Sequence, residues 1–139
     1  MKNLFLTLAT VLVLGTATIS AQDAAVEPTK MEQVMASHDV VMDKMPLISK
    51  LINQLQTKAN ASYEKKKYED AIADLKNANK SMMTWMESFG KRFNADEMLK
   101  GKQLNPQKQD WILEEEINVE ELDEEINLSI DQAEAVLNN

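Results

Sequence analysis

The single histidine of the chain, His38, lies in the methionine-rich stretch HDVVMDKM, residues 38–45. On a helix, residues three and four positions apart are neighbours, so Met35, His38 and Met42 would face the same way. Thioethers are soft ligands that suit Cu(I), and imidazole joins them readily. These three residues are therefore candidate copper ligands. Because Met and His are also axial ligands of haem, a b-type haem is the second candidate ligand.

Core packing explains the same residues without any ligand, and it is the interpretation that we favour. The methionines of residues 31–45 recur where the core residues of a helix recur, and methionine fills irregular gaps near a proline such as Pro46. A buried His38 then needs an acid or a backbone carbonyl as hydrogen-bond partner, because burying an unpaired polar group is costly. The methionines of a second helix are predicted to be core residues for the same reason: Met82, Met83 and Met86.

Other catalytic chemistry lacks the residues that it needs. The chain has no cysteine, which excludes a thiol nucleophile, Fe–S ligation, a disulfide and lipid attachment to cysteine. One histidine cannot form a two-histidine zinc motif, and the Glu-x-x-His pair of di-iron bundles would need glutamate at Met35. No glycine-rich phosphate loop and no aspartate-rich calcium loop is present. We therefore predict that the protein is not an enzyme and has no cofactor.

Charge is distributed unevenly along the chain. The formal net charge is −8, and the part from Gln109 to the end holds eleven acids and no base. This balance argues against nucleic-acid binding, which requires a basic surface. The run EEEINVEELDEE, residues 114–125, could attract divalent cations loosely, but a solvated helix face is the favoured interpretation. The acids that begin this last helix are expected to lie beside basic residues at the end of the second: Lys80, Lys91 and Arg92.

The first residues, MKNLFLTLATVLVLGTATISAQ, have the pattern of a secretory signal peptide. Lys2 is the basic start, and the apolar stretch from Leu4 to Leu14 is too short to span a bilayer comfortably. Small residues follow, so we place cleavage after Ala21; the alternative is an uncleaved membrane anchor. The product would be exported, to the periplasm or outside the cell, with no membrane segment after residue 21.

The rest of the chain is predicted to be all-α, because glycine and proline are rare and strong helix formers dominate. Residues 22–28 form a flexible leader, and Thr29 with Glu32 forms a capping box for a helix over residues 30–61. Pro46 should kink this helix or break it in two. Its apolar stripe consists of Met31, Val34, Met35, His38, Val41, Met42, Met45, Ile48, Leu51, Ile52 and Leu55.

Two further long helices have heptad patterns. The second is predicted over residues 65–89, with Gly90 as a left-handed C-terminal cap. Asn94 should cap a short helical turn that ends near Gly101, and Asn105 should cap a third long helix to about residue 137, with Pro106 in its first turn. The predicted core rows are Tyr68, Leu75, Met82 and Phe89, with Trp85 beside them, and Ile112, Val119, Ile126 and Ala133.

Three amphipathic helices with short connections predict an antiparallel up-down-up three-helix bundle over residues 29–139, preceded by the signal peptide. The heptads could instead serve an extended coiled coil between chains, but we favour packing within one chain. Trp111, at the start of the third helix, either packs over the end of the bundle or binds a partner.

Three helical motifs carry a resemblance to a known family: HDVVMDKM, ANKSMMTWMESF and INLSIDQAEAVL. Together they resemble a group of small exported bacterial proteins, often labelled "viral A-type inclusion protein", that look like helical bundles of unknown activity. Where the family pattern has proline directly after Met42, this chain has Asp43, and its proline comes at Pro46. The resemblance implies a helical bundle and supplies no catalytic residues.

These observations lead to one expected function and one alternative. We expect an exported, non-enzymatic, acidic helical bundle that acts through contacts with an unknown protein partner in the periplasm or at the envelope. The alternative is a periplasmic bundle that binds copper or haem through Met35, His38 and Met42.

Overall fold

A computed structural model describes residues 27–138, and every helix in this range belongs to one bundle. The predicted signal peptide, residues 1–21, and most of the predicted leader lie outside the described residues. The prediction of an all-α fold is confirmed, since no strand occurs within residues 27–138. The helices are α1 (Lys30–Met42), α2 (Met45–Ala61), α3 (Lys65–Arg92), α4 (Ala95–Leu99) and α5 (Pro106–Asn138).

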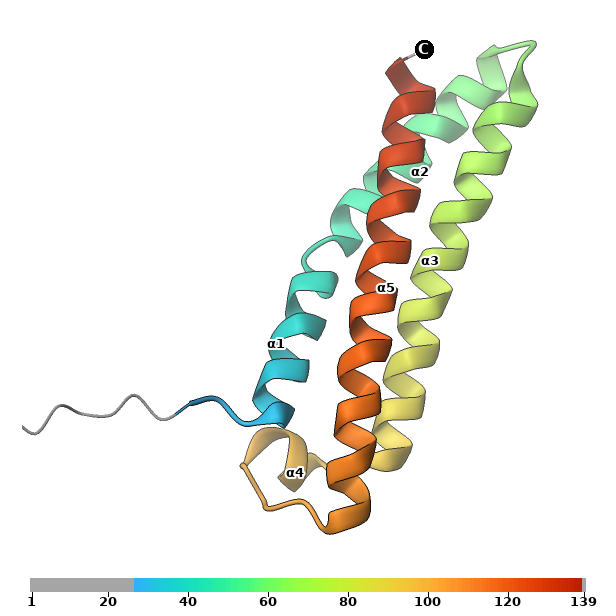
Figure 1. The fold of residues 1–139 in the computed structure, drawn as a ribbon. Coiled ribbons are helices and arrows are strands. Elements are labelled where there is room, and N and C mark those ends of the chain that lie inside the picture. Colours follow the sequence, from blue (N-terminus) through green and yellow to red (C-terminus); the bar gives the residue numbers. More distant parts are fainter. Residues whose placement is uncertain (1–26, 139) are drawn as a thin grey trace, which may run out of the picture.

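The bundle consists of three long rods (Figure 1). The first is α1 followed by α2, on one side of α5; the second is α3, along another side of α5; and the third is α5 itself. Ion pairs fix the relative directions of the rods. Lys30, which begins α1, lies 2.6 Å from Glu116 near the start of α5, and Arg92, which ends α3, lies 2.7 Å from Glu114. The start of α1 and the end of α3 therefore both lie beside the start of α5.

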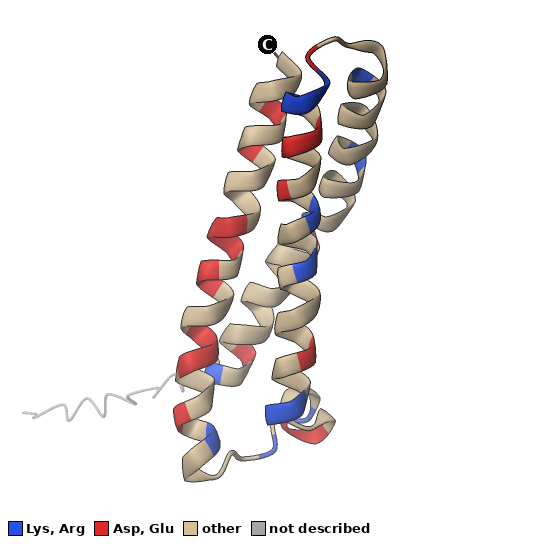
Figure 2. Ribbon diagram, turned by 90° about the vertical axis from the view of Figure 1, so that its right-hand side faces the viewer, with Lys and Arg blue, Asp and Glu red and all other residues tan. Residues whose placement is uncertain are grey.

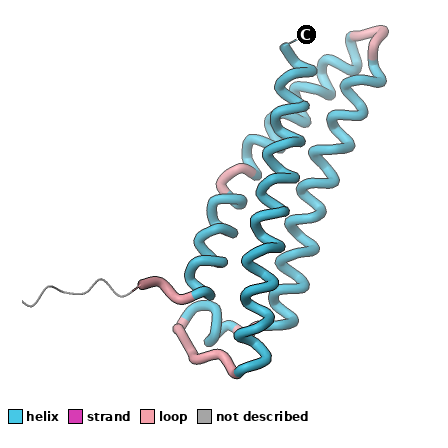
Figure 3. The backbone as a smooth tube through the Cα atoms, viewed as in Figure 1, coloured by secondary structure: helices cyan, strands magenta, loops and turns pink. Residues whose placement is uncertain are grey.

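The first rod is broken beside Pro46, as the sequence predicts. Asp43 and Lys44 form a turn between α1 and α2 (Figure 3), and Pro46 lies in the first turn of α2, where its missing N–H leaves no helical bond unmade. The Lys44 ammonium donates to the Asp123 carboxylate and to the side-chain oxygen of Asn127 (2.7 Å). These contacts hold the break against α5.

Side-chain caps begin three of the helices at the predicted residues. The Thr29 N–H donates to the Glu32 carboxylate (2.7 Å), and the Glu32 N–H donates to the Thr29 hydroxyl (3.2 Å), which together form the capping box of α1. Asn94 caps α4 in the same way, and the side-chain oxygen of Asn105 accepts from the Lys108 N–H (2.9 Å) at the start of α5. These local bonds satisfy backbone donors that a helix leaves unpaired.

The predicted C-terminal cap at Gly90 is wrong. Helix α3 continues through Gly90 to Arg92, and Phe93 follows in extended conformation. The physical reason is packing: Phe93 is 1% exposed, so one more turn of α3 places another aromatic ring in the core. The glycine with a positive φ is Gly101 (66°), where α4 has ended and the chain turns toward α5.

The core contains every member of the two predicted heptad rows in α3 and α5. Two methionines predicted as core residues are exposed instead: Met42 (44%) and Met83 (66%). Met42 is the last residue of α1, so the helical stripe ends there and the next side chains that contact the core are those of Met45 and Ile48 after the turn. Met83 follows the buried Met82 and points to the solvent side of α3.

The bundle has two different ends. At the end that we call the capped end, α4 crosses between the start of α1, the end of α3 and the start of α5 (Figure 1). At the open end, the turn of residues 62–64 joins α2 to α3, and α5 terminates beside them. Between residues 27 and 138, no helix is both long and apolar enough to cross a membrane.

Candidate functional site

The His38 side chain belongs to the core of the bundle. It is 9% exposed, and its ring stacks on Trp85 of α3 with 5.7 Å between ring centroids. Its Nδ1 atom lies 3.1 Å from a carboxylate oxygen of Asp39, which is the kind of partner that a buried histidine needs. These contacts favour the core-packing interpretation of His38.

The other two candidate metal ligands differ from His38 in exposure. Met35 is half-buried and packs against the core, whereas Met42 is exposed to solvent. The part of the chain that the structure describes contains no Met/His group and no cluster of three His, Cys, Asp or Glu side chains placed to hold a metal. The acidic run of residues 114–125 accordingly forms no such cluster, although its carboxylates recur along α5 (Figure 2).

Aromatic rings continue from His38 toward the capped end. Trp85 stacks on Phe89 and Phe89 contacts Phe93, each pair with centroids 4.8 Å apart, so two residues of α3 and the residue that follows the helix build one continuous row. Trp85 is 8% exposed, which confirms its predicted core position. Its indole N–H is the one buried side-chain polar atom of residues 27–138 without a hydrogen-bond partner.

Arg92 joins the end of α3 to the start of α5 through two carboxylates. Its guanidinium lies 2.7 Å from Glu114 and 3.0 Å from Glu115, which confirms the predicted contact for Arg92, whereas Lys91 pairs with Glu87 of its own helix. It also lies over the ring of Trp111, which is half-buried against the end of the bundle. The side chain of Glu115 is only 3% exposed, so its charge depends on Arg92 and on the Asn118 amide, which donates at 3.3 Å.

Glu97 is a second buried carboxylate that the sequence analysis missed. The Lys108 ammonium donates to both of its oxygens (2.9 and 2.6 Å), and the Asn94 N–H donates at 2.9 Å. These donors, the ammonium first, hold the pKa of Glu97 below its ordinary value. The Asn94–Glu97 capping-box spacing was the available signal. The pair fixes α4 against α5 and leaves no free group for chemistry.

The exposed side of α5 carries apolar residues as well as acids. Leu113, Ile117 and Leu128 are 49%, 58% and 63% exposed. With Glu121 and Glu124 they follow spacings of four, four, three and four, so they form one row along the helix, which we call the α5 outer row. Neither glutamate forms an ion pair within the described residues. The sequence predicts only the stripe of α5 that enters the core, so this row was not expected.

The α5 outer row is the best candidate for a functional surface within the described residues. It offers apolar area and unpaired negative charge, which can bind a partner. Comparisons with protein-family models, with curated proteins and with solved structures found no match.

Proposed function

We propose that the protein is an exported, non-enzymatic helical bundle that acts by binding a protein partner through the α5 outer row. In this proposal residues 1–21 are a signal peptide removed after Ala21. Residues 29–139 act as an antiparallel up-down-up three-helix bundle, with α1 and α2 as one broken rod. The protein works in the periplasm or outside the cell, as do the exported bundles that its motifs resemble.

One observation carries the proposal: α5 has apolar residues on two sides although the bundle covers only one. A helix in a bundle needs a single apolar stripe, and an isolated exposed apolar side chain is ordinary. Here three of them lie on one row that faces away from the buried positions Val119 and Ile126. Such spaced anchors are the means by which one helix recognises another.

The charges of the α5 outer row define the chemistry of the partner. Glu121 and Glu124 lie between the apolar residues, and neighbouring Glu120 is also exposed without an ion pair in the described structure. A partner helix with apolar anchors flanked by lysine or arginine would match both features. Opposite charges would also speed the encounter and make it sensitive to salt.

Binding is tested with a labelled model helix that has leucine at spacings of three and four and lysine beside them. We expect saturable binding by fluorescence anisotropy that weakens as salt is raised. Substituting Leu113, Ile117 and Leu128 with Gln should weaken it by at least about tenfold, which corresponds to about 1.4 kcal/mol. The matched control changes the exposed Tyr63, Met83 and Leu99 to Gln and should leave binding unchanged.

Two results would contradict this proposal. One is an equal loss of binding in the control variant, and the other is equal binding of a model helix with glutamate in place of lysine. Export is tested separately by expressing the full chain in a Gram-negative bacterium and determining the N-terminus of the protein in the periplasmic fraction. A mature protein that begins at Gln22 is expected, and a cytoplasmic protein that still begins at Met1 would disprove export.

A further inference from the structure

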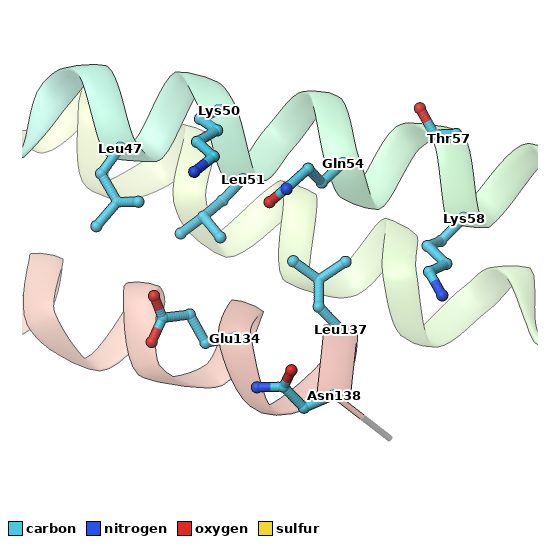
Figure 4. A pocket seen from close by; sticks show the side chains of 9 residues that line it. All are labelled: Leu47, Lys50, Leu51, Gln54, Thr57, Lys58, Glu134, Leu137 and Asn138. Carbon is cyan, nitrogen blue, oxygen red and sulfur yellow. The ribbon is translucent and has the colours of Figure 1, made fainter.

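A cleft of about 660 Å³ lies at the open end, between α2 and the last turns of α5 (Figure 4). Figure 4 shows the side chains of Leu47, Leu51 and Leu137 pointing into the space between the two helices, with Lys50 and Lys58 reaching from α2 toward α5. Its full lining is Leu47, Lys50, Leu51, Gln54, Thr57, Lys58, Glu134, Leu137 and Asn138.

The sequence explains why the two helices separate here. Helix α2 packs more extensively against α3 than against α5, and its buried residues are Ile48, Leu51, Leu55 and Ala59. The last buried residue of α5 is Ala133. Leu137, one turn later, is only half-buried, so apolar side chains line a space that the bundle does not fill.

The charge of the cleft is opposite to that of the molecule as a whole. The chain has a net charge of −8, yet two lysines and one glutamate line this cleft. Lys50 and Lys58 are exposed and form no ion pair within the described residues. They lie about 12 Å apart along the helix axis, at 1.5 Å per residue. Either ammonium can therefore bind an anionic head group at the rim.

We propose that this cleft binds a small amphiphile with one negative charge, such as a molecule with a carboxylate head and an alkyl chain. The chain would lie against Leu47, Leu51 and Leu137, and the head would bind Lys50 or Lys58. Gln54 adds a hydrogen-bonding amide between the two lysines. The volume lies within the roughly 300–1,000 Å³ that is usual for small-molecule sites. Glu134, on the opposite wall, disfavours ligands with several negative charges.

The test is a calorimetric titration of the protein that begins at Gln22 with laurate, kept below the concentration at which laurate forms micelles. We expect saturable binding of one laurate. Dodecyltrimethylammonium, which has the same chain but the opposite charge, should bind at least about tenfold more weakly. Acetate, which has the head group alone, should not bind measurably. Equal binding of the cationic amphiphile would disprove the role of the lysines.

Lys50→Gln with Lys58→Gln should weaken laurate binding by about tenfold, because a hydrogen bond to a charged group is lost. The matched control is Lys76→Gln with Lys80→Gln, which removes the same charge from exposed positions of α3 and should not change the affinity. All four side chains are exposed, so the fold should be retained, as circular dichroism can verify. An equal loss in both variants would overturn the proposal.

The position of the ligand is tested by NMR chemical-shift perturbation, which should be confined to residues that line the cleft. Leu137→Asn should weaken laurate binding while leaving acetate without effect. Perturbations on another face, or binding to anionic phospholipid vesicles without binding of monomeric laurate, would contradict the proposal.

Because the α5 outer row lies on another side of α5, Lys50→Gln with Lys58→Gln should leave binding of the basic model helix unchanged. The two proposals can therefore fail independently.

Discussion

The capped end and the open end of the bundle are held together in different ways. At the capped end, two buried carboxylates, Glu97 and Glu115, each have a basic partner from another helix, and the aromatic row ends beside them at Phe93. At the open end, α2 and α5 diverge around a cleft, and the charged residues that line it form no ion pair within the described residues. Paired buried groups hold the helices together at the capped end, whereas the open end has an accessible cleft.

This difference indicates where stability and binding reside. Buried charges are costly unless they are paired, so the ion pairs of Glu97 and Glu115 are expected to matter for stability where they join α3, α4 and α5. At the open end α2 packs less against α5 than against α3, so the exposed Lys50 and Lys58 beside the cleft can change without loss of the fold. A bundle built in this way can keep its structure while one end binds a ligand.

The largest expected effect is that of Phe89→Ala. Phe89 is fully buried between Trp85 and Phe93, so its removal should lower the free energy of unfolding by about 3–5 kcal/mol. Leu137→Ala at the open end should cost much less, because Leu137 is only half-buried. Urea denaturation of both variants measures the difference. Equal losses would show that the two ends do not differ in packing.

The next largest effect is expected for Arg92→Met, which leaves the buried Glu115 without its cation. The free energy of unfolding should fall by about 1–3 kcal/mol, the cost of an unsatisfied buried group. Lys91→Met is the matched control, since the Lys91–Glu87 pair is exposed on both sides (70% and 71%) and should contribute at most about 1 kcal/mol. A control variant as unstable as Arg92→Met would argue against a special role for the buried pair.

Acid should destabilise the capped end through Glu97. The pKa of this carboxyl is lowered in the folded protein, mainly by the hydrogen bonds from Lys108, so the ionised form is favoured by folding. Its contribution to stability is fully present above the ordinary pKa of 4.5. The contribution is lost as the pH falls from 4.5 through the lowered pKa that Glu97 has in the folded protein.

Glu97→Gln removes this linkage and should be less stable than the wild type at pH 7. The difference should shrink as the pH falls below 4.5, and denaturant unfolding at a series of pH values measures it. Glu120→Gln, at an exposed position without an ion pair in the described structure, should follow the pH dependence of the wild type. If the stability of Glu97→Gln had the same pH dependence as that of the wild type, the loss of stability in acid would not come from the Glu97–Lys108 pair.

The features that the sequence predicts correctly depend on residues close together along the chain. The Thr29–Glu32 capping box, the Asn105 cap and the break beside Pro46 each require only a few neighbouring residues, so spacing alone is sufficient. The heptad row from Tyr68 to Phe89 is likewise a property of one helix. All of these features depend on the spacing of residues within a single segment of the chain.

The candidate sites depend on contacts between distant segments, and here the sequence was less informative. Glu115 is buried because Arg92 arrives from another helix, and Met42 is exposed because α1 ends at that residue. The residues of the α5 outer row have helical spacing in the sequence. This spacing alone does not show which of the two apolar sides of the helix faces the core. The cleft could not be predicted, since it depends on how far α2 and α5 diverge.

The smallest expected effect concerns Gly90, and its sign separates the structure from the sequence prediction. Gly90 is an exposed residue inside α3, and a Cβ added there would meet no atom within 4 Å. Gly90→Ala should therefore stabilise the capped end by about 0.5–1 kcal/mol, because alanine loses less conformational freedom in a helix. A left-handed cap at Gly90 would give the opposite sign.

Gly101→Ala is the control and should destabilise, since Gly101 has a φ of 66°. Thermal denaturation of both variants decides between the two: a lower melting temperature for Gly90→Ala would mean that α3 ends before Phe93 can complete the aromatic row.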